Sequence, residues 1–184
     1  MTGSERRGGS AGELAVLGLL TALLFGGKLA LAWLPNVEPV SLLVIVYTAV
    51  LGWRALLPLY AYVLLEVVTW GLNLWSVCYV YVWLILAGAA WLLRRMESPL
   101  GWAALSGGFG LAFGALCTPV YLLSGGWAFA LSWWVQGIPF DIIHCGGNFC
   151  MALVLFRPLR SLLERLAGRA GLRGRAASLP EGAG

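Results

Sequence analysis

Hydrophobic runs separated by short polar breaks dominate this sequence. Six apolar runs of 14 to 22 residues predict six membrane-spanning helices, at residues 14–34, 40–53, 55–71, 74–93, 102–123 and 139–156. A helix of about 20 residues, rising 1.5 Å per residue, matches the roughly 30 Å hydrocarbon core of a bilayer. We therefore predict an all-α integral membrane protein, a six-transmembrane-helix bundle over residues 14–157. A disordered polar arm (residues 1–13) and an Arg-rich tail (residues 158–184) are expected to flank it.

Two of these boundaries come from length and proline arguments. A single helix over residues 40–71 would be about 48 Å long, so we place a turn at Gly52-Trp53-Arg54; five spans is the alternative count. Residues 127–156 are also too long for one perpendicular span. Because proline is favoured in the first turn of a helix and disruptive in its middle, we start the sixth helix near Pro139. Residues 127–136 then form an interfacial loop or short helix.

The arginines test this count. With six spans, all chain ends and loops that carry arginine fall on one side, and the opposite loops, near residues 36–38, 73 and 125–126, contain no Lys or Arg. Because positive residues favour the cytoplasmic side, both termini are predicted to be cytoplasmic, in a multi-pass protein of the plasma membrane. Cleavage after Ala30-Leu31-Ala32, as in a signal peptide, is the alternative; the apolar run is longer than an ordinary signal sequence, so we expect no cleavage.

Composition supports a membrane location. Of the 184 residues, 60% are apolar and 11% are charged, against about 45–50% and about 25% in soluble domains. A soluble globule, a disordered chain and a nucleic-acid-binding domain are therefore excluded, and membrane lipid is the expected environment. The net charge of +4 comes from arginines at chain ends and loops, and basic residues in such places indicate how a protein is oriented in the membrane. The four cysteines lack zinc spacing, so we predict reduced thiols and no metal site.

Titratable residues lie at membrane depth on three predicted helices. Lys28, Glu66 and His144 each lie about 7–9 Å below the arginine-poor surface, and Asp141 shares a helix face with His144. Ionisable groups inside a span usually face a cavity or a partner. We therefore predict a ligand-binding cavity open to the outside. The alternative is that Lys28–Glu66 or Asp141–His144 pairs only tie helices together.

Aromatic residues crowd the same outer end, where an interfacial belt explains many of them. Aromatic walls with a few polar groups are also what a small-molecule pocket needs. The candidate ligand-binding residues, outer-loop side chains included, are Lys28, Asn36, Glu38, Glu66, Trp70, Asn73, Tyr79, Tyr121, Asp141, His144 and Asn148.

Small residues recur every four positions on two predicted helices. Such stripes let helices approach closely in lipid. For the stripe at Ser106, Gly110 and Gly114 we expect packing within the molecule. For the stripe at Gly18, Ala22 and Gly26, which continues to Ala30, we predict a docking face for another membrane protein.

Catalytic motifs are missing from the sequence. It has no Walker A sequence, no GxSxG and no HExxH, so we expect neither an enzyme nor a resident cofactor, and any ATP hydrolysis would occur in partner subunits. Two alternatives stay open: a membrane enzyme with His144 as a base oriented by Asp141, and a structural or assembly subunit. Cys145 beside His144 also allows a metal or corrinoid ligand.

Particular stretches of the chain carry a family resemblance. They are Leu34-Pro-Asn-Val-Glu-Pro39, Leu64-Leu-Glu66 and Gly137-Ile-Pro-Phe-Asp-Ile-Ile-His-Cys-Gly-Gly-Asn-Phe149. Over about residues 14–160 the chain resembles the substrate-binding (S) components of energy-coupling factor transporters, in a branch whose ligand is unassigned.

That resemblance implies a subunit that captures a vitamin-like micronutrient from outside. It would dock on a transmembrane coupling protein driven by two ATPase subunits. The family docks through an Ala-x3-Ala pattern on its first helix. Gly18, Ala22 and Gly26 would fill that role here, with glycine for alanine at two positions.

Overall fold

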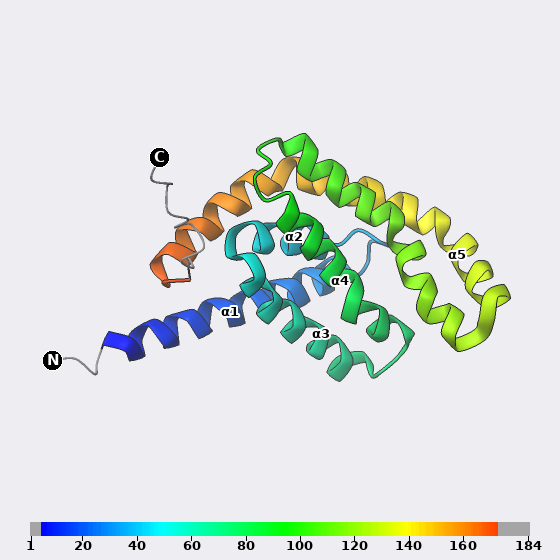
Figure 1. The fold of residues 1–184 in the computed structure, drawn as a ribbon, viewed down its shortest axis with the longest axis horizontal. Coiled ribbons are helices and arrows are strands. Elements are labelled where there is room, and N and C mark those ends of the chain that lie inside the picture. Colours follow the sequence, from blue (N-terminus) through cyan, green and yellow to red (C-terminus); the bar gives the residue numbers. More distant parts are fainter. Residues whose placement is uncertain (1–4, 173–184) are drawn as a thin grey trace, which may run out of the picture.

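The fold is helical throughout the part of the chain that the structure, a computed structural model, describes, residues 5–172. The elements in order are α1 (Glu5–Ala30), α2 (Val40–Leu51), the short 3₁₀ helix η1 (Gly52–Ala55), α3 (Leu56–Trp70), α4 (Leu74–Leu92) and α5 (Pro99–Arg169). No strand occurs within residues 5–172, so the all-α prediction is confirmed for them. Figure 1 shows that α1 begins and α5 ends at the same end of the molecule.

The long element α5 is two helices joined at Gly126. Gly126 has a φ of +76°, and its backbone is the one interruption of helical geometry within α5. This left-handed conformation suits glycine because it has no Cβ. We call residues 99–125 the first arm and residues 127–169 the second arm; the two arms fold back on each other as a hairpin (Figure 1).

The predicted turn between the second and third runs is confirmed. Helix α2 ends at Leu51, Gly52 has a φ of +59°, and η1 redirects the chain into α3. Pro58 lies in the first turn of α3, where its missing N–H has no intrahelical partner to lose.

Two predicted boundaries are wrong. Residues 5–13, expected to be a disordered arm, belong to α1. The sixth helix does not start at Pro139, because the second arm is helical from residue 127 and carries Pro139 and Pro158 inside it. A continuous helix satisfies the hydrogen bonds of its own backbone in an apolar surrounding. This gain outweighs the loss of the one backbone hydrogen bond that each proline removes. The predicted arm and tail also include residues 1–4 and 173–184, which lie outside the described residues.

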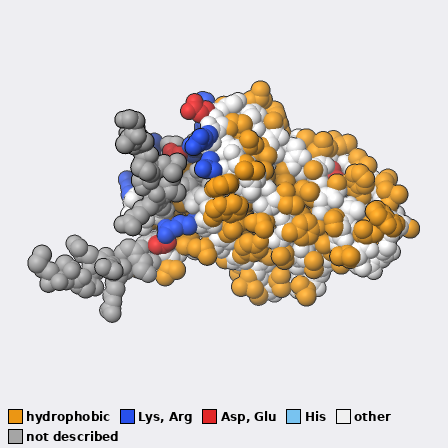
Figure 2. Space-filling view, viewed as in Figure 1, with side chains coloured by type: hydrophobic (Ala, Val, Ile, Leu, Met, Phe, Trp, Pro, Cys, Tyr) orange, Lys and Arg blue, Asp and Glu red, His pale blue; other side chains and the backbone are white. Residues whose placement is uncertain are grey.

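Within residues 5–172, four helical stretches are long and apolar enough to cross a bilayer: Ala11–Ala30, Val40–Trp70, Leu74–Leu92 and Pro99–Arg169. Figure 2 shows hydrophobic side chains over most of the visible face, while Lys and Arg gather at the end where α1 begins. This is compatible with a helical membrane protein. The count of six spans stays a prediction.

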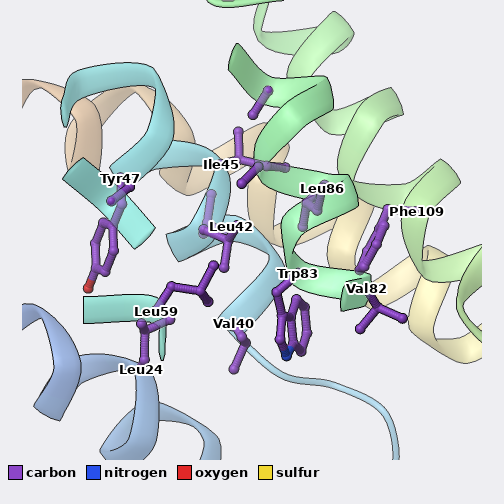
Figure 3. Close-up of a cluster of buried hydrophobic side chains, with 14 of the residues drawn as sticks. Leu24, Val40, Leu42, Ile45, Tyr47, Leu59, Val82, Trp83, Leu86 and Phe109 are labelled. Atoms are coloured by element: carbon purple, nitrogen blue, oxygen red, sulfur yellow. The ribbon is translucent and has the colours of Figure 1, made fainter. Parts of the chain in front are cut away.

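The core is built around α2. Nine of its twelve residues are buried, as expected of a helix that is apolar on all sides. Figure 3 shows Leu42 and Ile45 of α2 among side chains from the surrounding helices, including Leu24 of α1 and Trp83 of α4. By contrast α1 packs mainly against α3 and buries only a small part of its surface. The buried centre thus holds the outer helices in fixed positions around one end of the bundle.

Candidate ligand-binding cavity

One cavity of about 800 Å³ opens at the end of the bundle away from the start of α1. It lies between the end of α1, the loop that follows it, the facing ends of α3 and α4, and both arms of α5. Small-molecule sites commonly have volumes of about 300–1,000 Å³. The cavity is therefore large enough for a small organic ligand.

Nine of the eleven candidate residues line this cavity. They are Lys28, Asn36, Glu38, Glu66, Trp70, Asn73, Tyr79, Asp141 and His144. The buried members, among them Glu66, Asp141 and His144, form its floor, whereas Asn36, Trp70 and Asn73 are exposed at its rim. Side chains that lie far apart in the sequence thus meet around one space, as the depth argument predicted. Their role in binding stays a prediction.

The structure does not bring Tyr121 and Asn148 to the cavity. Tyr121 stacks behind the wall on Trp133, with ring centroids 3.8 Å apart. Asn148 is fully buried, and its Nδ2 donates to the Ser41 hydroxyl at 3.0 Å and to the Ser106 carbonyl at 3.4 Å. Asn148 lies one turn below His144, where the second arm faces α2 and the first arm. These two residues therefore hold helices together.

Lys28 and Glu66 form an ion pair at one side of the floor. The Lys28 Nζ lies 2.6 Å from Glu66 Oε2 and donates a second hydrogen bond to the Tyr79 hydroxyl at 3.1 Å. The helix-tying pair that the sequence allowed is thus formed, joining α1, α3 and α4, while all three side chains also line the cavity. The other carboxylate oxygen, Glu66 Oε1, is buried and has no hydrogen-bond partner among the described residues.

Asp141 and His144 occupy the opposite side, on the second arm. Asp141 Oδ1 accepts a hydrogen bond from the Gly114 backbone N–H at 3.1 Å. No Asp141–His144 ion pair occurs in the described part of the chain, so the alternative in which they pair with each other is wrong. His144 Nε2 instead lies 3.8 Å from Glu38 Oε1, beyond hydrogen-bond distance. Asp141 Oδ2 and His144 Nε2 are buried and lack a hydrogen-bond partner within residues 11–172.

Glu38 lies in the loop between α1 and α2. Burial raises the pKa of its carboxyl from about 4.5 to about 7; nearby Lys28 lowers the pKa and Glu66 raises it further. Glu38 therefore exchanges its proton near neutral pH. A cation arriving in the cavity would favour its ionised form.

Aromatic side chains that the candidate set omits complete the wall: Trp75, Phe113, Trp133 and Phe140. Trp75 stacks on Phe113 with ring centroids 5.9 Å apart and meets Trp133 edge-on at 6.0 Å. Helical spacing could have found two of them, because Trp75 lies four residues before Tyr79, and Phe140 four before His144. Side chains at this spacing share a helix face.

The two stripes of small residues differ in their surroundings. A Cβ at Gly110 would lie 2.8 Å from the backbone of His144, and one at Gly114 would collide with the Asp141 carboxylate. The first-arm stripe is therefore packed within the molecule, as predicted. A Cβ on Gly18 or Gly26 would meet nothing within 4 Å, and both glycines lie with Ala22 on the exposed side of α1. That face is free to contact another molecule.

Metal binding finds no further support in the geometry. The described residues contain no group of three or more His, Cys, Asp and Glu side chains that could hold a metal ion. His144 lines the cavity, whereas Cys145 does not.

Comparison with known proteins returned no match to a family model, a curated protein or a solved structure.

Proposed function

We propose that this chain is the substrate-capture subunit of an ATP-driven uptake transporter, of the kind represented by the S components of energy-coupling factor systems. It would bind a small organic micronutrient in the cavity on the outer side of the plasma membrane. The observation that carries the proposal is the convergence of Lys28, Glu66, Asp141 and His144 on one cavity, with unpartnered polar atoms in its floor. Buried polar atoms without partners are costly, so they point to a ligand that completes their hydrogen bonds.

The predicted membrane topology supports this function. Six spans with both termini in the cytoplasm would place the cavity outside, and α1 begins and α5 ends at the end of the molecule opposite the cavity. The exposed small-residue face of α1 would contact a transmembrane coupling protein, and two ATPase subunits bound to that protein would supply the energy. Close approach along small residues is a common way for helices to associate in lipid.

An enzymatic role is not proposed, because the base and its orienting carboxylate do not meet. Asp141 accepts from the Gly114 backbone instead of His144.

Mass spectrometry of the molecule that travels with the protein tests the proposal. Full-length protein would be purified from native membranes in lipid nanodiscs, washed, and denatured to release what it holds. We expect one small organic compound at about one per chain, and its loss from the Glu66→Gln/Asp141→Asn double variant. Glu97→Gln, an exposed loop substitution, is the matched control and should retain it. Protein that carries no compound and binds none from a vitamin panel would contradict the proposal.

A further inference from the structure

The charges around the cavity are unbalanced. Three carboxylates line it, Glu38, Glu66 and Asp141, against one lysine and one histidine. Lys28 is already bound to Glu66 and Tyr79. Asp141 has no cationic side chain within 4 Å in the described part of the chain, and Glu38 has only His144, at 3.8 Å.

Two of the oxygens of these cavity-lining carboxylates have no hydrogen bond in the described part of the chain. Glu66 Oε1 and Asp141 Oδ2 are both buried without a protein partner within residues 11–172, and both residues are more than nine-tenths buried. A buried carboxylate oxygen is satisfied only by a donor, and most strongly by a charged one. A ligand carboxylate or phosphate would instead face three acids and a lysine that is already paired.

The walls of the same cavity are aromatic. Trp75 is in contact with three other cavity rings: it stacks on Phe113, and meets Trp133 and Tyr79 edge-on with centroids 6.0 and 6.5 Å apart. Flat rings stack on such surfaces, and cations are attracted to the ring faces.

We infer that the cavity takes a flat organic cation: an aromatic or heteroaromatic ring that carries a protonated amine or a positively charged ring nitrogen. The ring lies against the wall that includes Trp75 and Trp133, and the cationic group donates to Asp141 and Glu38. This inference specifies the substrate class within the proposed function, on which it rests.

Three probes that share one ring test the sign of the charge. Tryptamine, indole-3-ethanol and indole-3-propionate end in an ammonium, a hydroxyl and a carboxylate. Their binding to full-length protein in nanodiscs would be measured by calorimetry at pH 8, where Glu38 is mostly ionised. We expect tryptamine to bind at least about tenfold more tightly than the alcohol, which is about 1.4 kcal/mol, and the carboxylate to bind no better than the alcohol.

Variants locate the effect in the floor of the cavity. Asp141→Asn keeps the oxygen that accepts from the Gly114 N–H but removes the negative charge. Glu38→Gln removes the negative charge of the loop residue. Each should bring the tryptamine affinity to within about threefold of the alcohol's affinity, which itself should not change, while Glu97→Gln should leave all three affinities unchanged. Unchanged affinity of indole-3-ethanol shows that the variants are folded. Trp75→Leu should weaken tryptamine and the alcohol together.

The inference is overturned if the alcohol or the carboxylate binds as tightly as tryptamine, if both acid variants keep the preference for tryptamine, or if none of the probes binds. This failure is distinguishable from failure of the proposed function. A co-purified anionic or neutral compound would overturn the inference and leave the transport role standing. An empty protein that binds no vitamin would remove the transport role, while the probes still report on the cavity.

Discussion

The first helix and the first arm of α5 carry almost the same sequence signal and use it in opposite ways. On α1, Gly18, Ala22 and Gly26 are exposed, and a Cβ on either glycine meets nothing within 4 Å. On the first arm of α5, Gly110 and Gly114 lie directly against the second arm. A stripe of small residues therefore indicates that a close approach is possible, but not by which partner.

The difference matters for the site. The first-arm stripe allows the second arm close enough for Asp141 to accept from Gly114 N–H and for Asn148 to donate to the Ser106 carbonyl. Close packing inside the hairpin thus positions half of the cavity floor. The exposed stripe of α1 contributes nothing to the cavity, although Lys28 on the same helix does.

Gly110→Leu should break the packed stripe and give the largest effect. The added side chain has no space beside the His144 backbone, so we expect a loss of more than about 3 kcal/mol, at the upper end for overpacking. Thermal unfolding in detergent micelles measures it. Gly18→Leu on α1 is the matched control and should change the unfolding temperature little; equal losses at both sites would show that the two stripes do not differ.

Glu38 joins the two regions, because it follows α1 and faces the second arm, and it should make stability depend on pH. It faces Lys28 of α1, Glu66 and Tyr62 of α3, Tyr79 of α4 and His144 of α5. Its pKa is about 7 in the folded chain against about 4.5 unfolded, so the folded state binds the proton more tightly.

The contribution of Glu38 to stability is therefore fully present below pH 4.5 and lost as the pH rises through 7, by up to about 3 kcal/mol. Unfolding of the wild type and of Glu38→Gln from pH 4 to 9 measures it. The wild-type loss between pH 4.5 and 8 should be smaller in Glu38→Gln; parallel curves would contradict the assignment.

Lys28→Met tests how strongly the ion pair with Glu66 attaches α1 to α3. It leaves Glu66 buried without its cation, at a cost of about 2 kcal/mol, less than for a fully buried pair because Lys28 is 26% exposed. Adding Glu66→Gln should restore more than half of the loss. The coupling, measured as a double-mutant cycle of unfolding free energies, would be absent if the two side chains did not interact.

Ala22→Leu should have the smallest effect on stability, below about 0.5 kcal/mol, because its site is exposed. It should nevertheless reduce co-purification with the coupling protein about tenfold or more, because a bulky side chain separates helices that meet along small residues. Ala61→Leu, at an exposed site on α3, is the control. Retention of the partner by the Ala22 variant would argue against docking through α1.

Much of the site could be predicted from the chain because charged residues are rare in it, at 11% of the sequence. Lys28, Glu66 and His144 stood out at similar depth, and the structure places all three around one cavity. Tyr121 was placed at the correct end but on the wrong side of Trp133, since depth along a helix carries no information on rotation about its axis. Phe113 was missed because an aromatic residue in an apolar run has no distinguishing neighbour in the sequence.

The order of apolar runs and polar breaks by itself determined that this chain is a set of hydrophobic helices with a turn at Gly52 and ionisable groups near one end. Tertiary structure alone decided which face of each helix packs against the rest of the molecule. Asn148 faces Ser41, Lys28 pairs with Glu66, and one glycine stripe is covered while the other is open. The physical reason is that these helices are apolar on most sides. The 3.6-residue alternation that marks the inner face of a soluble helix is therefore weak here, and side-chain packing has to choose the face.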